Sequence, residues 1–558
     1  MAAYRGPRRG APGRRGTTGR AGPRRGDQGS ASTNRTGADP STTDLPGAGR
    51  PATDRSATGR SATDRSATGR PGPGRGNAGR GADLPRRTAY DVLAAVETRQ
   101  SYANLLLPRL LAERGITGRD AALATELSYG TLRGLGTYDA VLAACSDRPL
   151  DKLDPPVLQV LRLGAHQLLA TRVAAHAAVA TSVDLARAVG GPRVSGYVNA
   201  VLRRVATRDL DAWLPLVAPD PAADAEGYLA VRYSYPRWIV AAYRDALGPA
   251  ADTELAAALA AGNDRPRVTM AAFPGGPPRE AIMPEGAEPT RWSPYGFTLA
   301  GGDPSSLVAD GVAAVQDEAS QLAAIALATA PLDGPDRLWL DMCAGPGGKA
   351  RLLYGLAEEA GAQLIAADLH EHRAALVRDA LARTPRHGSG TAVITADGRR
   401  PPWPEAAFDR VLLDVPCSGL GALRRRPEAR WRKAESDLPA LAELQRALLR
   451  SALAACRPGG VVAYVTCSPV PAETRDVVTA VASSTPTTEI LAAPAILSPP
   501  TEVVDAPAVL SPATEILDAP AVLSPVPDIR SPAPQFAQLW PHRHTTDAIF
   551  IALLRRIP

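Results

Sequence analysis

An apolar run that ends in an acid and opens directly into a glycine-rich turn constrains this chain most. It reads Leu338-Trp-Leu-Asp-Met-Cys-Ala-Gly-Pro-Gly-Gly-Lys349. Its glycines let backbone N–H groups approach a ligand, and a helix expected over 350–360 would point its positive end at the ligand's carboxylate. This pattern predicts the first strand and the cofactor loop of a doubly wound domain. The glycine spacing matches neither dinucleotide nor nucleoside triphosphate fingerprints, which favours S-adenosylmethionine, although a plain tight turn explains the segment alone equally well.

The region after this loop alternates β-rich runs with helical stretches, as in the βαβ units of a parallel sheet. The expected strands lie at 364–368, 392–397, 408–414 and 461–467, with closing strands at 539–544 and 548–554. Four acids stand at strand ends, namely Asp341, Asp368, Asp397 and Asp414. Ligands bind outside the carboxyl ends of parallel strands, so these acids should converge on one crevice. A lone acid of this kind is usually a helix cap, but four around one glycine-rich loop favour a binding site.

The chain is too long for one core, and its composition divides it into four parts. We expect a disordered Arg/Gly-rich tail over 1–85, an all-α domain over 86–206, a linker with a small α/β unit over 207–335, and a Rossmann-like α/β domain over 336–558. Inside the last domain, 484–535 carries an imperfect proline-rich repeat. Proline at this frequency breaks both helix and sheet, so this insertion should be disordered or extended.

The basic charge of the chain is concentrated in the tail. Residues 1–84 hold 16 Arg and 6 Asp and no Lys or Glu, a net charge of +10, whereas the whole chain carries +6. Such a segment cannot bury enough apolar area to offset its chain entropy. Its Arg-Gly clusters suit a salt-sensitive attraction to nucleic acid, and a merely solubilising extension fits the composition equally well.

Cysteine usage and hydropathy indicate the compartment. The five cysteines stand singly, without a C-x-x-C pair, which is typical of neither a disulfide framework nor a zinc site. The sequence has no run of about 18 apolar residues, and its Arg-rich start lacks the apolar core of a signal peptide. We therefore expect a soluble cytoplasmic protein that binds no metal and enters no membrane.

Apolar residues recur at helical spacing from 86 to about 205, with short breaks at 115–118, 147–151 and 190–192. This predicts a compact bundle of six or seven helices. The bundle holds no constellation that could do chemistry, because His166 and His176 stand singly on apolar helices, where a core role is favoured over a ligand role. Between 206 and 335 we expect a strand near 267–271 and a helix over 316–327.

Two cysteines lie at consecutive strand ends. Cys417 belongs to Asp414-Val-Pro-Cys-Ser-Gly419, and Cys467 belongs to Val465-Thr-Cys-Ser468. Adjacent strand ends should bring both sulfurs to the mouth that holds the glycine-rich loop. A single buried cysteine is usually a small hydrophobe, as we expect for Cys145 and Cys456. Two cysteines in short polar turns at neighbouring strand ends favour chemistry instead.

A thiolate is useful for methylating a pyrimidine carbon. Carbon 5 of the ring is too weak a nucleophile by itself, but addition of a thiolate to carbon 6 turns the ring into an enamine. A carboxylic acid at ring N3 stabilises the charge that develops, and Asp414 lies close to Cys417 in sequence. A base must then remove the carbon 5 proton so that the thiolate can leave. Cytosine with a cysteine nucleophile fits these residues better than a nitrogen or oxygen acceptor, which needs no cysteine.

Four segments together resemble the NOL1/NOP2/Sun family of RNA cytosine-C5 methyltransferases. They are 341–349, 414–419, 466–468 with Glu473 beyond, and 315–321. Segments 126–130 and 196–204 of the helical region resemble the antitermination factor NusB, which implies an RNA-binding module. The two halves together are most similar to the Sun (RsmB) branch, which modifies small-subunit (16S) ribosomal RNA. The resemblance covers about 86–556, without the insertion.

The resemblance implies S-adenosylmethionine as the cofactor and assigns residues to it. The loop that would wrap its methionine part consists of Cys343, Ala344, Gly345, Pro346, Gly347, Gly348 and Lys349. By the same match Asp368 would bind the ribose hydroxyls, Asp397 the adenine edge, and Asp414 both cofactor and cytosine. Cys467 would be the nucleophile, and Cys417 would assist product release.

Three positions in these motifs stand out. Lys349 is one of three lysines beside 60 arginines, which suggests a compact ammonium near the base, although chance retention is an alternative. Gly345 replaces an alanine of the family, a change that should only loosen the turn. Thr474 follows Glu473 where the family usually has asparagine, which bears on the orientation of the Cys467 turn.

Other functions remain open. The chain could be an RNA-binding ribosome assembly factor with a vestigial methyltransferase fold, although both cysteines, Asp414 and Lys349 are present. It could methylate cytosine in another RNA. A DNA cytosine methyltransferase would use Cys417 and carry a large recognition region downstream, where this chain has only the proline-rich repeat. We expect small-subunit ribosomal RNA as the partner and a monomeric enzyme.

Overall fold

The computed structural model describes residues 83–384, 391–484, 488–491, 526, 528–529, 531–533 and 535–557. The tail up to residue 82 and most of the proline-rich insertion lie outside these residues. The first helix begins at Leu84, inside the range that the sequence assigned to the tail. Asp83 caps it by accepting a hydrogen bond from the Arg86 N–H, and Pro85 suits a first helical turn. Among the described residues, no helix is long and apolar enough to span a bilayer.

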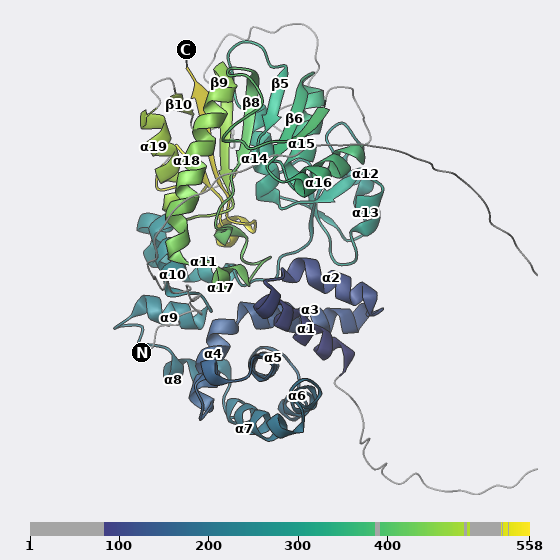
Figure 1. The fold of residues 1–558 in the computed structure, drawn as a ribbon, viewed down its shortest axis with the longest axis vertical. Coiled ribbons are helices and arrows are strands. Elements are labelled where there is room, and N and C mark those ends of the chain that lie inside the picture. The colour runs from purple at the N-terminus through teal and green to yellow at the C-terminus, as the bar shows by residue number, and fades with distance from the viewer. Residues whose placement is uncertain are drawn as a thin grey trace, which may run out of the picture. The chain divides into compact units, whose positions relative to one another are not determined.

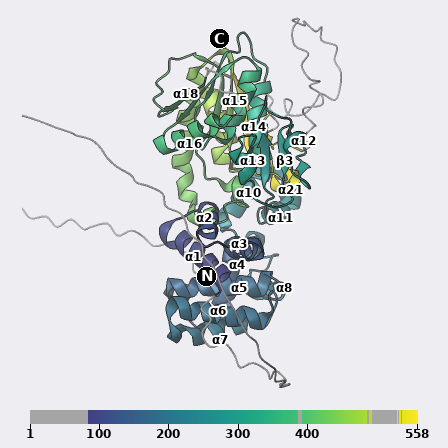
Figure 2. The ribbon, with the colours of Figure 1, turned by 90° about the vertical axis from the view of Figure 1, so that its right-hand side faces the viewer.

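The predicted helical bundle is confirmed by seven α-helices between Leu84 and Val205 in the described chain (Figures 1 and 2). They are α1 (Leu84–Arg99), α2 (Ala103–Glu113), α3 (Gly118–Arg133), α4 (Leu135–Cys145), α5 (Pro155–Ala170), α6 (Ala175–Gly190) and α7 (Ser195–Val205). Their apolar faces share one core that includes Leu93, Leu161 and Leu202. His166 is buried in α5, and its Nδ1 lies 2.9 Å from the Tyr138 hydroxyl, as a core histidine would.

Helices and a small sheet form the region between the bundle and the large sheet, where the sequence predicts a linker with a small α/β unit. Helices come first, namely α8 (Leu210–Val217), α9 (Ala225–Arg232), α10 (Arg237–Leu247) and α11 (Ala251–Ala261). An antiparallel sheet of order β2-β3-β1-β4 follows. It comprises β1 (Thr269–Ala272), β2 (Glu288–Pro289), β3 (Gly296–Thr298) and β4 (Ala313–Val315), with α12 (Arg279–Ile282) and α13 (Ser305–Ala309) between them. The expected strand near 267–271 is therefore β1.

The second sheet confirms the predicted doubly wound domain. In the described residues it has the order β10-β12-β9-β8-β5-β6-β7, and β11 pairs with β12 outside this path. Strands β5 to β9 are mutually parallel, whereas β12 runs antiparallel to β9 and β10. The strands are β5 (Leu338–Asp341), β6 (Gln363–Asp368), β7 (Thr391–Thr395), β8 (Phe408–Asp414), β9 (Cys456–Thr466), β10 (Thr488–Leu491), β11 (Ala537–Gln538) and β12 (Phe550–Arg556).

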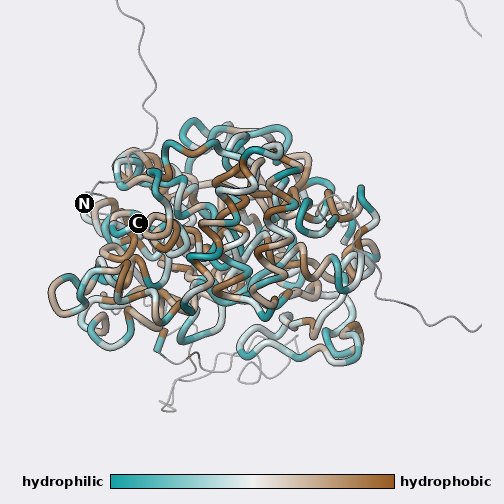
Figure 3. Tube along the Cα trace, turned by 90° about the horizontal axis from the view of Figure 1, so that it is seen from below, coloured by the Kyte–Doolittle hydropathy of each residue, from teal (hydrophilic) through white to brown (hydrophobic). Residues whose placement is uncertain are grey.

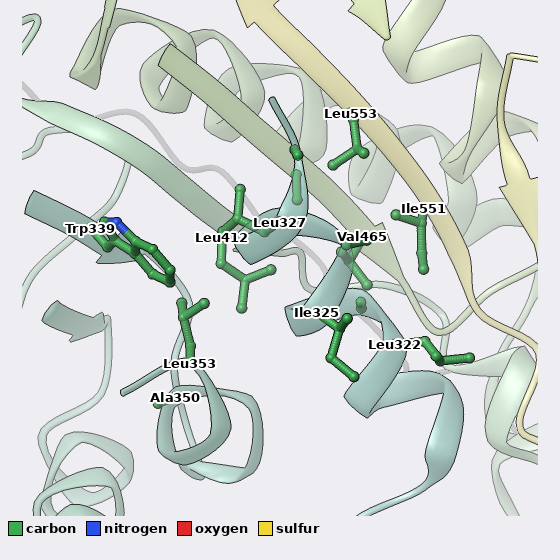
Figure 4. Packing of buried hydrophobic residues seen from close by; sticks show 14 of the residues in the cluster. Leu322, Ile325, Leu327, Trp339, Ala350, Leu353, Leu412, Val465, Ile551 and Leu553 are labelled. Carbon is green, nitrogen blue, oxygen red and sulfur yellow. The ribbon is translucent and has the colours of Figure 1, made fainter. Parts of the chain in front are cut away.

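Helices cover both faces of this sheet (Figure 1). The helices are α14 (Glu318–Thr329), α15 (Gly348–Glu359) and α16 (Glu371–Ala382) on one face, and α18 (Leu438–Ala455) and α19 (Arg475–Ser484) on the other, with short α17 (Ala429–Arg432) and α21 (Pro541–His544) in loops. Successive strand side chains alternate between the faces. Leu412 lies beside Leu327 of α14 in the core of one face (Figure 4), whereas its neighbour Leu413 belongs to the core of the other face with Leu449 of α18. Brown apolar segments accordingly gather inside the trace in Figure 3.

Two expected strands differ in the structure. Strand β7 ends at Thr395, so Asp397 lies two residues beyond the strand. The strand expected over 539–544 is wrong, because α21 occupies Pro541–His544. Pro541 has no N–H to offer a ladder, and the Trp540 N–H donates to His544 Nδ1 at 2.8 Å, which closes the turn locally. The last expected strand is confirmed as β12.

Candidate active site

The glycine-rich loop forms the predicted turn between β5 and α15. β5 lies between β6 and β8, where the strand order reverses, and such a switch point is the usual ligand crevice of an open α/β sheet. Gly347 caps α15 with φ of 111°. A Cβ at this position would lie 2.9 Å from the Ala380 Cβ, so both backbone and space require glycine.

Asp341, the last residue of β5, is a buried acid whose carboxyl group has no ordinary hydrogen-bond partner in the described chain. Neither carboxylate oxygen meets an ordinary hydrogen-bond geometry with the described residues. Burial, and then the negative charge of Asp414, raises the pKa of Asp341 to about 8, and the positive charge of Lys349 and the nearby Cys343 N–H only moderate this rise. A buried carboxylate of this kind fits a ligand that brings a positive charge.

A pocket of about 280 Å³ opens beside this acid. Its walls are Val315, Gln316, Asp317, Ser320, Asp341, Cys343, Ala344, Gly345, Pro346, Gly348, Lys349, Asp414, Arg425, Arg426 and Asp547. Most of the predicted loop residues therefore share one pocket with Asp414. Gly347, Asp368, Asp397, Cys417 and Cys467 are not part of this wall. Cys343 stays a thiol there, because burial raises its pKa.

Asp368 holds the loop rather than facing the pocket. It is 4% exposed, and its carboxylate accepts hydrogen bonds from the backbone N–H groups of Gly345 and His370, each at 3.0 Å. Arg373 pairs with the same carboxylate at 3.3 Å. A Cβ at Gly345 would lie 2.4 Å from the nearer Asp368 oxygen. An alanine at position 345 would therefore require the Asp368 and Arg373 side chains to shift, so the glycine also gives Asp368 room beside the loop.

Asp397 is committed to its own turn. Both of its oxygens accept hydrogen bonds from the Arg399 side chain, at 2.9 and 2.8 Å, and the Arg399 N–H adds a third at 3.0 Å. These hydrogen bonds lower the pKa of Asp397.

The described residues hold no cluster of three or more His, Cys, Asp or Glu side chains suited to a metal ion.

Lys349 and Asp414 form an ion pair in the pocket. Lys349 Nζ donates to Asp414 Oδ2 at 2.9 Å, and the two side chains are 13% and 29% exposed. Burial works to lower the pKa of Lys349, but the charge of Asp414 and its hydrogen bond outweigh burial and raise it. The pair presents a fixed ammonium and a carboxylate at one place, which suits a base with neighbouring acceptor and donor atoms.

The two candidate cysteines lie side by side, as the strand ends predict. The Cys417 and Cys467 Sγ atoms are 3.3 Å apart. The hydrogen bond with Cys417 lowers the pKa of Cys467; burial and Asp414 oppose this effect, and Lys349 and Arg426 support it. The same hydrogen bond, together with burial, raises the pKa of Cys417 well above its usual range. Cys467 is therefore the thiol that more readily becomes a thiolate, and Cys417 is the one that keeps its proton.

A buried carboxylate joins the turns that carry these cysteines. Glu473 is fully buried, and it accepts hydrogen bonds from the Ser418 N–H at 2.7 Å and the Ser468 hydroxyl at 2.7 Å. The Gln445 amide donates to it at 3.2 Å. In the sequence, Glu473 stands out only as part of a motif. The signal available in the sequence was the serine that follows each of the two cysteines.

We expect Glu473→Ala to destabilise the protein by about 2–4 kcal/mol, because it leaves several buried donors without an acceptor. Urea unfolding of the full chain measures this loss. Glu443→Ala is the matched control, because Glu443 is exposed on α18. Equal unfolding free energies in the two variants would mean that the Glu473 carboxylate does not hold the turns.

Buried ion pairs close the pocket on the side of β4 and the C-terminus. Arg424 and Arg425 each bind both Asp317, the cap of α14, and Asp547, which precedes β12, at 2.6–3.0 Å. Both acids are buried. Segment 315–321, the segment after Cys417 and the C-terminal strand are thereby held around one pocket.

Strand order, a cofactor-type loop at the switch point and polar groups at the strand ends together define a methyltransferase domain. The family model described as 16S rRNA methyltransferase RsmB/F matches residues 326–555, and the NusB family model matches residues 83–207. The chain belongs to the RsmB/F methyltransferase family and carries a NusB domain at its helical end.

Relatives along most of the chain agree with this assignment. MT1451 of Mycobacterium tuberculosis (strain CDC 1551 / Oshkosh), described only as a candidate methyltransferase, is 47% identical over 484 residues, which are 86% of this chain and 98% of MT1451. Ribosomal RNA small subunit methyltransferase B of Pseudomonas putida is 34% identical over 414 residues, 72% of this chain and 89% of its own. The crystal structure of PH0851 shares the fold, with a TM-score of 0.64 and 22% identity over 85% of this chain and 99% of PH0851.

Proposed function

We propose that this protein methylates carbon 5 of a cytosine in 16S ribosomal RNA, with S-adenosylmethionine as the methyl donor. The observation that carries the proposal is the contact between Cys417 and Cys467, at 3.3 Å, beside the Lys349–Asp414 pair. A nitrogen or oxygen acceptor needs no thiolate, whereas a pyrimidine carbon does. The relatives named ribosomal RNA small subunit methyltransferase B support the choice of RNA.

The residues of the pocket fit the cofactor. When bound, S-adenosylmethionine supplies an electrophilic methyl group on a positively charged sulfur. The buried carboxyl group of Asp341 can offer the opposite charge once it releases its proton, and loop 343–349 together with the start of α15 offers backbone N–H groups for a carboxylate. Asp368 and Asp397 remain the predicted contacts of the ribose and the adenine; their carboxylates, which now bind Gly345, Arg373 and Arg399, would share those partners with the cofactor.

Asp341→Asn should weaken S-adenosylmethionine binding about 10- to 100-fold, the loss of one charge-assisted contact.

In the free protein Asp341 holds its proton up to about pH 8, whereas in the unfolded chain it ionises near pH 4. The folded state therefore binds more protons between these values, so this group makes stability fall as pH rises through the window. We expect Asn at this position to remove that fall.

Calorimetry of cofactor binding and thermal unfolding from pH 5 to 9 measure both effects. Asp476→Asn, an exposed acid on α19, serves as the control. Unchanged cofactor affinity in Asp341→Asn would show that Asp341 does not meet the ligand's positive charge.

The chain's residues divide the chemistry of the base among them. The Cys467 thiolate adds to carbon 6, and the Asp414–Lys349 pair holds ring N3 and the neighbouring polar atoms, where charge develops. Carbon 5 then takes the methyl group and still carries its proton. When a base removes this proton, the carbon 5–carbon 6 double bond re-forms and the carbon 6–sulfur bond breaks. Cys417, which keeps its proton, lies beside the departing sulfur and stabilises it as a thiolate.

The direct test is bisulfite sequencing of unmodified 16S rRNA after incubation with the purified full chain and S-adenosylmethionine. We expect protection at a cytosine, and none without the cofactor. Methyl groups that enter the RNA without any protected cytosine would overturn the choice of carbon 5. RNA binding without methyl transfer would favour an assembly factor instead.

A further inference from the structure

Three consecutive arginines follow the Cys417 turn, and they differ in their partners. Arg424 and Arg425 are neutralised by Asp317 and Asp547. Arg426 is exposed, lines the pocket, and makes no ion pair with any described residue. It is close enough to Cys467 for its charge to favour the thiolate. A free guanidinium is thus present at the mouth of the candidate active site.

The other charges of the pocket leave two groups open. Lys349 and Asp414 neutralise one another, and Arg425 is paired. Arg426 has no ion pair with a described residue, and the Asp341 carboxyl group has no hydrogen-bond partner among them, although the charge of Lys349 acts on it from nearby. Ligands that complement these two groups therefore place a positive charge near Asp341 and a negative charge near Arg426. A sulfonium cofactor supplies the first, and a nucleic acid phosphate supplies the second.

The helical domain supplies the side chain that holds Arg426. The Arg426 Cζ lies 5.7 Å from the centroid of the Tyr102 ring, and the Arg432 Cζ lies 5.2 Å from it. The Ala103 N–H donates to the buried Glu428 carboxylate at 3.0 Å, and the Arg432 guanidinium donates to the Ser101 carbonyl. The start of α2 is thereby tied to the segment that follows Cys417.

The exposed face beside this contact is apolar. Tyr102, the residue before α2, is 46% exposed, and Leu105 in the first turn of α2 is 69% exposed. Aromatic side chains next to a cationic group are suited to unpaired nucleotides. Charge and apolar surface therefore meet at the rim of the pocket.

We propose that Arg426 binds a phosphate of the substrate RNA next to the target cytosine, and that Tyr102 is a positioning residue for its guanidinium. This inference rests on the RNA substrate of the proposed function. It makes the helical domain part of the site that presents the base, beyond a general RNA-binding module.

The test is steady-state methylation of unmodified 16S rRNA by the full chain, measured on the alkaline plateau so that Cys467 ionisation does not enter. We expect Arg426→Ala to raise KM about 10-fold, the loss of one charged phosphate contact, and to affect KM more than kcat. The dependence of log Kd on log salt, measured with a 12-nucleotide oligocytidylate, should become shallower by about 0.7. Arg426→Lys should keep the slope.

The positioning role predicts that Tyr102→Phe behaves like the wild type, because the ring is kept, and that Tyr102→Ala raises KM without changing the salt slope as much as Arg426→Ala does. Arg450→Ala is the matched control, because it removes the same charge from an exposed position on α18. Wild-type KM and slope in Arg426→Ala would overturn the inference. So would weaker S-adenosylmethionine binding with intact RNA binding, which would assign Arg426 to the cofactor. If the wild type leaves 16S rRNA unmethylated, the proposed function fails, while the oligocytidylate slope still decides on Arg426.

Discussion

Cys467→Ala is expected to lose methylation by at least about 10⁴-fold and to form no covalent complex with RNA, because it lacks the nucleophile that activates the ring. Cys417→Ala is expected to attack and to accept the methyl group, and then to stall. A protein–RNA band that survives denaturing electrophoresis should therefore accumulate in Cys417→Ala, and its methylated form should require S-adenosylmethionine.

The double variant Cys417→Ala with Cys467→Ala should show no band, which makes Cys467 the site of attachment. Cys145→Ala is the control, since Cys145 is a buried thiol of the helical bundle. A band in Cys467→Ala that is absent from Cys417→Ala would exchange the two roles. Retained methylation in both single variants would remove cysteine catalysis from the mechanism.

The structure gives a physical reason for this division of roles. A hydrogen bond between two thiols stabilises the thiolate of the acceptor and the protonated form of the donor, so the pair titrates as a unit. The cations of the site act on Cys467, because the charges of Lys349 and Arg426 both favour its thiolate. Glu473 and Asp414 both disfavour the Cys417 thiolate.

Much of this site follows from sequence because parallel strands end at one edge. The ends of β8 and β9 are neighbours, so two cysteines just beyond these strands had to meet. The loop after β5 had to lie beside them for the same reason. Local turn chemistry and the alternation of strands and helices were sufficient for these expectations.

Other features depend on contacts between distant segments, which no local pattern contains. Tyr102 meets Arg426 across 324 positions of sequence, and only the docking of α2 against the segment after Cys417 brings them together. Asp397 stands at the end of a β-rich run, yet Arg399 takes its carboxylate once the strand stops at Thr395. The residues around a strand-end acid determine whether it binds a ligand or caps a turn, and tertiary contacts bring those residues together.

The last prediction concerns the Lys349–Asp414 pair, whose members act on Cys467 in opposite ways. The ammonium of Lys349 lowers the pKa of Cys467, and the carboxylate of Asp414 raises it. Methylation requires the thiolate, so activity should rise with pH through the pKa of Cys467. Lys349→Met should therefore move this acid limb to higher pH, and Asp414→Asn should move it to lower pH. Both should lower the plateau by about 10²–10⁴-fold, the usual loss of a positioned acid or base.

The opposite directions separate electrostatics from structural damage, because a disturbed pocket would move both profiles the same way. The other groups that act on Cys467, namely Cys417 and Arg426, are unchanged in both variants. Lys152→Met is the control, since Lys152 is an exposed lysine of the helical domain. Rates of methyl transfer under single-turnover conditions from pH 6 to 10 give the profile. Parallel shifts in the two variants would mean that the pair supports the loop and does not tune the nucleophile.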